Sequence, residues 1–91
     1  MYDRIIYEDE TYQWRVTINV FRDVEYFHLR KYILDFEEKW VPIKEGVCFP
    51  LDLSNITELF TALVEILSLA ESKDVIAKHF SQILNEVYNN S

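Results

Sequence analysis

The residues whose types and spacing could do chemistry are aromatic, basic and polar, and they occupy every second position of residues 15–21 and again of residues 26–32. At first they alternate with Val16, Ile18 and Val20, which is the period of a strand with one face buried. Cations can follow phosphates and flat rings give bases a stacking surface, so such a face suits single-stranded nucleic acid. The side chains expected on this face are Arg15, Thr17, Asn19, Phe21, Tyr26, His28, Arg30 and Tyr32.

Further basic and aromatic side chains are expected beside this face, in the first turn and in or near the next strand. They are Arg22, Lys39, Trp40 and Lys44. Phe21 is expected to stack on a base, although a ring at a strand end can also belong to the core. Arg30 is expected to contact a phosphate, the alternative being an ion pair with a carboxylate such as Glu25 or Asp35.

The other rings and the histidines have structural alternatives that carry at least equal weight. Tyr26 and Tyr32 would equally well cover the edge of the sheet. Trp40 is favoured as a core or dimer anchor over a stacking surface. His28 fits a surface or core histidine better than a binding residue, and His79 in the last helical segment is expected to be structural.

Residue types that support catalysis or cofactor binding are sparse and poorly spaced. Gly46 is the one glycine, and a single glycine cannot build a nucleotide-binding loop. His28, His79 and Cys48 lack the spacing of a metal site. No serine, histidine and acidic residue have the spacing of a catalytic triad. We therefore expect no enzyme activity, no metal and no cofactor. Cys48, the one cysteine, is expected to be a small packed residue in a reducing compartment.

Size and composition describe one globular domain over residues 1–91, with 49% hydrophobic and 15% aromatic residues. A chain of this size alone buries only about 60–65% of its unfolded surface, so a dimer would add stability. No segment approaches the roughly 20 apolar residues that span a bilayer, and the N-terminus does not resemble a signal peptide. The expected location is the cytoplasm or nucleoid, or the host cytoplasm for a phage protein, without membrane contact.

The net charge of −7 argues against nucleic acid at first sight, but the charges are unevenly distributed. Residues 1–13 carry −3, residues 14–51 carry 0 and residues 52–91 carry −4. Six of the nine basic residues lie in the middle segment. Binding depends on the local field near the site, so nucleic acid stays compatible, while the acidic flanks should weaken non-specific affinity and steepen its loss with salt.

Hydrophobic spacing and turn residues predict short antiparallel strands. After a leading strand or arm at Tyr2–Tyr7, the four expected strands are Arg15–Phe21, Glu25–Phe36, Trp40–Ile43 and Val47–Phe49. Turns are expected at residues 22–24, 35–39 and 44–46, the last with Gly46 at a positive φ. The long second strand should bend and give the sheet a concave side. Pro42 places its strand near an edge or a bulge.

Helical spacing begins after the strands. Ser54 or Asn55 can cap a first helix, with Glu58 in the capping-box position. Its apolar band is wider than one sheet face requires, which predicts packing on the sheet and also on a partner. The side chains expected at a dimer interface are Leu59, Phe60, Leu63, Ile66 and Leu67. A second helix is expected over residues 72–89, with Ser72 as its N-cap.

Residues 14–69 resemble the family of the transcriptional coactivator positive cofactor four. The members of this family are small dimeric proteins that bind single-stranded DNA. The matching pieces are R-V-T-I-N-V-F at Arg15–Phe21, L-R-K-Y at Leu29–Tyr32 and W-V-P-I-K-E-G-V-C-F-P-L-D at Trp40–Asp52. The last is the most specific, because the family pattern there is roughly W-x-P-x-[KR]-K-G-[IV]-[ST]-[LF] before a helix. The sequence departs from the family at Glu45, where a second Lys is usual, and at Arg22–Glu25, where a Lys-Gly pair is usual.

The resemblance implies binding roles for particular positions. It carries the family's binding chemistry onto Phe21, Arg22, Arg30 and Lys44. Asn19 stands where a cation is common, and Glu45 in place of a cation implies weaker binding at the far end of the groove. The family's Ser/Lys-rich regulatory tail is missing, which implies a bacterial or phage member. The helix over residues 72–89 lies beyond the resemblance, and it would extend the dimer contact or cover a sheet edge.

We expect an α+β fold in which a curved four-stranded antiparallel sheet precedes one or two C-terminal helices, Whirly-like or positive cofactor four-like. The binding core would cover residues 14–69, with the additional helix at 72–89, and the helices would form a homodimer. The expected function is binding of single-stranded DNA with little sequence preference, in transcription, replication, recombination or repair, alongside transcription or replication proteins. The alternative is an acidic dimeric protein-interaction module whose DNA binding is weak or lost.

Overall fold

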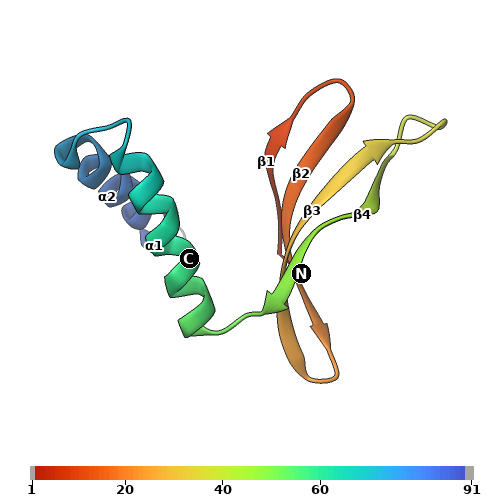
Figure 1. Ribbon diagram of the computed structural model, residues 1–91, viewed down its shortest axis with the longest axis horizontal. Helices are drawn as coiled ribbons and strands as arrows, with labels where there is room; N and C mark the ends of the chain where they lie inside the picture. Colours follow the sequence, from red (N-terminus) through yellow and green to blue (C-terminus); the bar gives the residue numbers. More distant parts are fainter. Residues whose placement is uncertain (1, 90–91) are drawn as a thin grey trace. The chain divides into compact units, whose positions relative to one another are not determined.

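The structure, a computed structural model, describes residues 2–89, and its first part is a four-stranded antiparallel sheet (Figure 1). The strands are β1 (Asp3–Glu8), β2 (Tyr12–Phe21), β3 (Val24–Leu34) and β4 (Trp40–Pro50). Each strand pairs with its neighbour in the sequence, which gives the order β1-β2-β3-β4. Figure 1 shows that the sheet is curved, as expected for strands of 10 or 11 residues. The predicted curved antiparallel sheet of four strands is confirmed.

The strands that make up this sheet differ from the prediction at the C-terminal end. Residues 40–50 form one strand, so the predicted strands Trp40–Ile43 and Val47–Phe49 are continuous, and the predicted turn at residues 44–46 is wrong. The count of four is right because the leading segment, expected as a strand or an arm, forms β1.

A bulge in β4 explains why a turn signal appeared within a strand. Arg30 of β3 pairs with Gly46, and Tyr32 pairs with Pro42, so three β4 residues face a single β3 residue between these pairs. A bulge bends a strand without reversing it, and it uses the same backbone freedom as a turn. The expectation that Pro42 marks an edge or a bulge is met on both counts, since β4 is an edge strand.

Gly46 occupies the crowded end of this bulge. Its φ is +148°, a conformation that residues with a side chain rarely adopt. A Cβ atom built there would lie 2.3 Å from the backbone oxygen of Leu29 and 2.9 Å from the Cα of Arg30. The close approach of β3 and β4 beside Arg30 therefore requires glycine.

The β2–β3 hairpin closes with a two-residue turn at Arg22 and Asp23, across which Phe21 pairs with Val24. Both turn residues have positive φ, 52° and 65°, as in a type I′ turn. Such a turn favours Asn-Gly, because a Cβ is strained in the left-handed region. The hairpin tip thus holds two non-glycine residues in an unfavourable backbone conformation directly beside Phe21.

Aspartates organise the other two turns of the sheet. Asp9 Oδ1 accepts the backbone N–H groups of Tyr12, at 2.9 Å, and of Thr11, at 2.8 Å. These hydrogen bonds lower the pKa of Asp9 to about 2, because they stabilise the ionised carboxylate. In the β3–β4 turn, Asp35 Oδ1 accepts two backbone N–H groups in the same manner. Both turns are therefore fixed by local polar contacts rather than by glycine.

One face of the sheet is apolar. Ile18 pairs with Phe27 and Phe27 with Phe49, and the two phenylalanine rings stack with centroids 5.0 Å apart. Of the hydrophobic side chains within residues 2–89, Phe27 alone is buried, while Val20 and Val47 are more than half exposed. The sheet by itself therefore encloses very little core.

Two helices follow the sheet, α1 (Leu53–Ser68) and α2 (Lys73–Asn89), and the chain from residue 56 forms a compact unit of its own. The rings of Phe60 and Phe80 lie 5.8 Å apart and join the two helices. Neither helix buries a side chain fully. No helix within residues 2–89 is long and apolar enough to cross a membrane.

The helix starts differ in how well the sequence located them. Asp52, rather than Ser54 or Asn55, precedes α1, and its Oδ1 accepts the backbone N–H of Asn55 at 2.7 Å. An aspartate side chain caps a helix as well as serine or asparagine does, so three neighbouring cap residues left the position open. Ser72 precedes α2 as predicted, and its Oγ accepts the N–H of Val75 at 3.3 Å.

Candidate nucleic-acid interface

The register of β2 and β3 gathers the predicted binding residues on one side of the sheet. Four direct pairs, Arg15 with Arg30, Thr17 with His28, Asn19 with Tyr26 and Gln13 with Tyr32, alternate with the apolar pairs. Residues directly opposite one another in an antiparallel pair share a face. We call this side, together with Phe21 at the end of β2, the polar–aromatic face. All eight side chains that the period-two pattern assigned to one face lie on it.

A hollow lies at the hairpin end of the polar–aromatic face. It measures about 310 Å³ and is lined by Asn19, Phe21, Tyr26, His28 and Cys48. Phe21 is 60% exposed, so its ring is available for contact with a flat partner. The hollow combines exposed ring surface with the Asn19 amide. Its volume is large enough for a small planar group from solution.

The cations near this hollow differ in how they are engaged. Arg22 at the hairpin tip places its guanidinium carbon 5.1 Å from the centroid of the Phe21 ring. Arg30, on β3, makes no ion pair with any residue of the described chain, so the expected alternative partners Glu25 and Asp35 do not neutralise it. Arg30 therefore leaves a positive charge on the polar–aromatic face.

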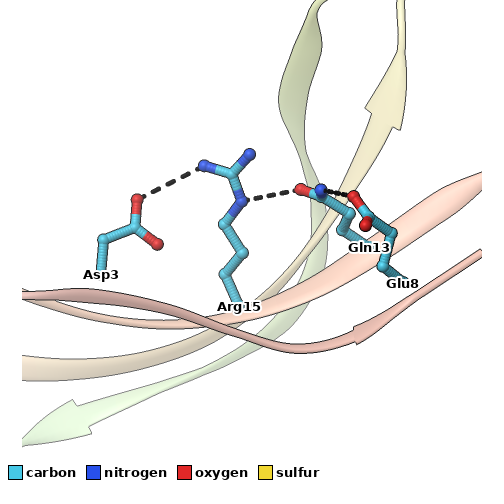
Figure 2. A network of polar contacts seen from close by, with 4 residues as sticks. All are labelled: Asp3, Glu8, Gln13 and Arg15. Carbon is cyan, nitrogen blue, oxygen red and sulfur yellow. Dashed lines mark hydrogen bonds and ion pairs between the residues drawn. The ribbon is translucent and has the colours of Figure 1, made fainter.

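Arg15 is tied into a polar network that reaches the edge strand β1 (Figure 2). Its Nε donates to Gln13 Oε1 at 2.8 Å, and its terminal nitrogen lies 3.3 Å from Asp3 Oδ2. Gln13 donates in turn to Glu8, and Gln13 is only 1% exposed. The guanidinium carbon also lies 4.2 Å from the centroid of the Tyr32 ring. The positive charge of Arg15 is thus directed toward neighbouring protein groups.

His28 lies in the middle of the polar–aromatic face, with its Nε2 3.8 Å from Cys48 Sγ. Its Nδ1 is buried and has no hydrogen-bond partner. Burial, and secondly the positive charge of Arg30, lower the pKa of His28 below its usual value of 6.5. The ring is therefore neutral at pH 7 and adds polarity and flat surface to the face, but no cation.

The remaining predicted residues lie at the margins. Trp40 pairs with Leu34, in step with Tyr32, and so extends the polar–aromatic face at the end opposite the hollow. Lys39 is in the β3–β4 turn, and its Nζ pairs with Glu37 at 3.4 Å. Lys44 lies in the β4 bulge, is exposed and makes no ion pair with the described residues. Trp40 therefore lies on the polar–aromatic face, whereas Lys39 lies in the adjoining turn and is paired with Glu37.

Glu45 stands where the family usually has a lysine, and it lies on the side of the sheet opposite the polar–aromatic face. Its carboxylate lies 3.3 Å from Lys31 Nζ, and Lys31 also lies 4.5 Å from the Tyr12 ring centroid. Lys31 pairs with Trp14, out of step with Arg30 and Tyr32, which places it on the opposite side of the sheet. The negative charge of Glu45 is thus neutralised on the apolar side.

Sequence reasoning missed several members of the polar–aromatic face. Gln13 continues the period-two pattern of β2, so its parity alone would have placed it there. Asp3 and Glu8 come from β1, and their positions depend on a bulge at Ile6 that no sequence signal marks. Cys48 was expected to be packed, but it is exposed, because β4 is an edge strand and leaves this side open.

Side chains that could bind a metal ion are scattered over the described residues. Within residues 2–89, no three His, Cys, Asp or Glu side chains gather closely enough to hold a metal ion. His28 and Cys48 approach one another, but they have no third ligand, and a protein zinc site needs at least three. What the face offers is rings, amides and a small number of cations.

Comparisons with known proteins identify the family of the chain. The model of the family described as Transcriptional Coactivator p15 (PC4) matches residues 9–56. A similar solved structure is the bacteriophage T5 homolog of the eukaryotic transcription coactivator PC4, which is implicated in recombination-dependent DNA replication. It shares 33% identity over 90% of this chain and 93% of that chain, with a TM-score of 0.75.

A second structure shares the fold at lower identity. It is a PC4 homolog from Burkholderia pseudomallei, with 17% identity, 76% of this chain and 88% of that chain covered, and a TM-score of 0.59. No curated protein sequence matches the chain significantly. The family match over half of the chain and the phage structure confirm the predicted resemblance, and the chain belongs to the PC4 family of transcriptional coactivators.

Proposed function

We propose that the protein binds single-stranded DNA along the polar–aromatic face, with little sequence preference. The observation that carries the proposal is the register of β2 and β3. It places Arg30, Tyr26 and Tyr32 on one face with the exposed Phe21 ring, and Phe21 and Tyr26 line a hollow of about 310 Å³ that could receive a base. Rings accept any base by stacking, and the cations need only follow the backbone.

The process served by this binding is proposed from the related phage protein. That protein is described as implicated in recombination-dependent DNA replication, and it matches this chain over 90% of its length. Replication and recombination expose unpaired strands, and a protein that binds them would hold them apart. We place this chain in the same kind of process, with transcription and repair as further settings for the same binding.

A homodimer is part of the proposal. Phe27 is the only buried hydrophobic side chain of the described sheet, and neither helix buries a side chain. Phe60, Leu63 and Ile66 of α1 are each at least half exposed. A stable protein of this size needs more buried apolar surface than one chain supplies. A second copy would supply that surface through α1 and would present two polar–aromatic faces.

A protein-interaction module remains the second candidate, and one observation favours it. Asp3 and Glu8 of β1 stand on the polar–aromatic face, and the whole chain carries a net charge of −7. Carboxylates repel phosphates, so a face with these charges could instead bind a basic protein. The two candidate functions differ in whether the polar–aromatic face binds DNA.

The decisive experiment is a fluorescence-anisotropy titration with labelled oligo-dT and a matching duplex, at low and near-physiological salt. We expect binding to the single strand, weaker binding to the duplex, and affinity that falls with salt. An absence of binding to either DNA at low salt would refute the proposal and favour the protein-interaction module.

Phe21→Ala should weaken the affinity for single strands by about 1–3 kcal/mol, because it removes a base-stacking surface. The matched control is Phe36→Ala, since Phe36 is fully exposed in the β3–β4 turn, away from the polar–aromatic face. Circular dichroism would verify the fold of both variants. Equal affinities for Phe21→Ala, Phe36→Ala and the unaltered protein would rule out Phe21 as a stacking surface.

A further inference from the structure

The two arginines at the centre of the polar–aromatic face carry the same charge in different surroundings. Arg15 and Arg30 are a direct cross-strand pair, and like charges directly opposite one another are destabilising. Arg15 is drawn to Asp3, Gln13 and Tyr32, and its side chain is only 19% exposed. Arg30 has no ion-pair partner within the described residues. The pair is tolerated because Asp3 neutralises one member.

We infer that Arg15 is a positioning residue that fixes Tyr32 as a base-stacking surface, and that it does not contact phosphate. The inference rests on the proposed binding of single strands to this face. A guanidinium is planar and can donate to Gln13 and Asp3 while it lies over the Tyr32 ring. Gln13 is the most buried side chain of the described chain and pairs directly with Tyr32, so the support beneath Arg15 is rigid.

A charge inventory of the sheet extends the inference to the whole interface. Three of its seven cations, Arg15, Lys31 and Lys39, are paired with carboxylates. Arg4 pairs with Val16 and so lies on the apolar side. Phosphate contacts are thereby left to Arg22, Arg30 and Lys44. The bound strand is consequently held mainly through its bases.

This division of roles predicts a shallow salt dependence. Each phosphate contact to a single strand contributes about −0.7 to the slope of log affinity against log salt. Three contacts per chain give a slope of roughly −2. If every predicted cation contacted phosphate, Arg15 and Lys39 would add two contacts and the slope would be about −3.5.

The first test measures these slopes with labelled oligo-dT between about 50 and 200 mM salt. Arg30→Gln should make the slope shallower by about 0.7. The double variant Arg15→Gln with Asp3→Asn removes one charge of each sign and should leave the slope unchanged, while lowering affinity equally at every salt concentration. A slope that becomes shallower in the double variant, as in Arg30→Gln, would overturn the inference.

The second test uses a substitution that keeps the charge. Arg15→Lys retains the cation but loses the planar donor geometry, so it should weaken binding as much as the double variant does. If lysine instead preserved the affinity, Arg15 would be acting as a phosphate contact. Arg15→Lys also tests the inference if the double variant does not fold.

The third test couples Arg15 to the tyrosine ring. Tyr32→Ala should weaken single-strand binding about 5- to 150-fold in the unaltered protein, and by clearly less in the Arg15→Lys background. Equal losses in the two backgrounds would show that Arg15 and Tyr32 act independently and would refute the positioning role. An unaltered protein that binds no single strand would refute the proposed function itself, whereas a binding protein with a steep slope would refute this inference alone.

Discussion

His28 is the histidine of the polar–aromatic face, and its surroundings disfavour the protonated ring. Its Nδ1 is buried without a partner, its Nε2 faces Cys48 Sγ at 3.8 Å, and Arg30 lies on the same strand. Protonation would place a donor where no acceptor exists and a positive charge beside Arg30. The folded protein therefore binds this proton less readily than the unfolded chain does.

The pH dependence of stability follows from the lowered pKa of His28. Well above pH 6.5 the ring is neutral in both states and contributes no penalty. As the pH falls below 6.5 the unfolded chain takes up the proton first, so the free energy of unfolding decreases until the lowered folded pKa is passed. Urea denaturation between pH 5 and 7.5 should show this loss, and His28→Gln should reduce it.

His79→Gln is the matched control for that measurement, since His79 belongs to α2 and not to a strand of the sheet. It should keep the pH dependence of the unaltered protein. A His28→Gln protein with an unchanged pH profile would show that His28 does not titrate differently in the two states.

For single residues, the sequence predicted the face of the sheet on which they lie but not the side chains that they contact. Parity predicted that Arg15 and Arg30 share a face, and the register confirms it. Parity could not distinguish Arg15, which has an ion-pair partner, from Arg30, which has none among the described residues. The ion pair of Arg15 depends on Asp3, which belongs to β1, and β1 has a bulge at Ile6. Polar partners from a distant segment leave no trace in local spacing.

Among the elements, β4 depends most on a single residue. Gly46→Ala would place a Cβ 2.3 Å from the Leu29 carbonyl oxygen, so β3 and β4 would have to separate beside Arg30. We expect a loss of about 2–4 kcal/mol in the free energy of unfolding, from backbone strain and lost strand pairing. Thermal or urea denaturation would measure it.

Cys48→Ala is the control for that substitution, because Cys48 is an exposed residue of the same strand. It should change stability by no more than about 0.5 kcal/mol. Equal stability of Gly46→Ala and the unaltered protein would mean that β4 adopts another register.

The elements were predictable where periodicity was long and ambiguous where turn signals competed. Alternation predicted residues 15–21 of β2, whose first three residues it missed, and residues 25–34 of β3, and helical spacing with Ser72 identified α2. The K-E-G segment at residues 44–46 reads locally as a turn, and only pairing with β3 shows it to be a bulge. Bulges and turns use the same residues, so the distinction is set by the neighbouring strand.

For the whole molecule, the central prediction is association. We expect a dimer by sedimentation at micromolar concentration, because one chain buries so little apolar surface. Leu63→Glu, on the apolar side of α1, should raise the dissociation constant at least about tenfold by placing a charge in the contact.

Thr57→Glu provides the comparison, since it adds the same charge on the polar side of α1, where Thr57 is exposed. It should leave the dimer intact. A monomeric unaltered protein would contradict the proposed interface through Leu59, Phe60, Leu63, Ile66 and Leu67.

The β4 edge has a consequence for how copies of the sheet can meet. Pro42 and Pro50 have no N–H to offer a neighbouring strand, and the bulge between them breaks the flat row of backbone groups. An open edge with regular, unpaired N–H and C=O groups would recruit further strands and grow into aggregates. The bulge that brings Gly46 against Arg30 should therefore also disfavour the pairing of further strands along β4, and with it the aggregation of neighbouring sheets.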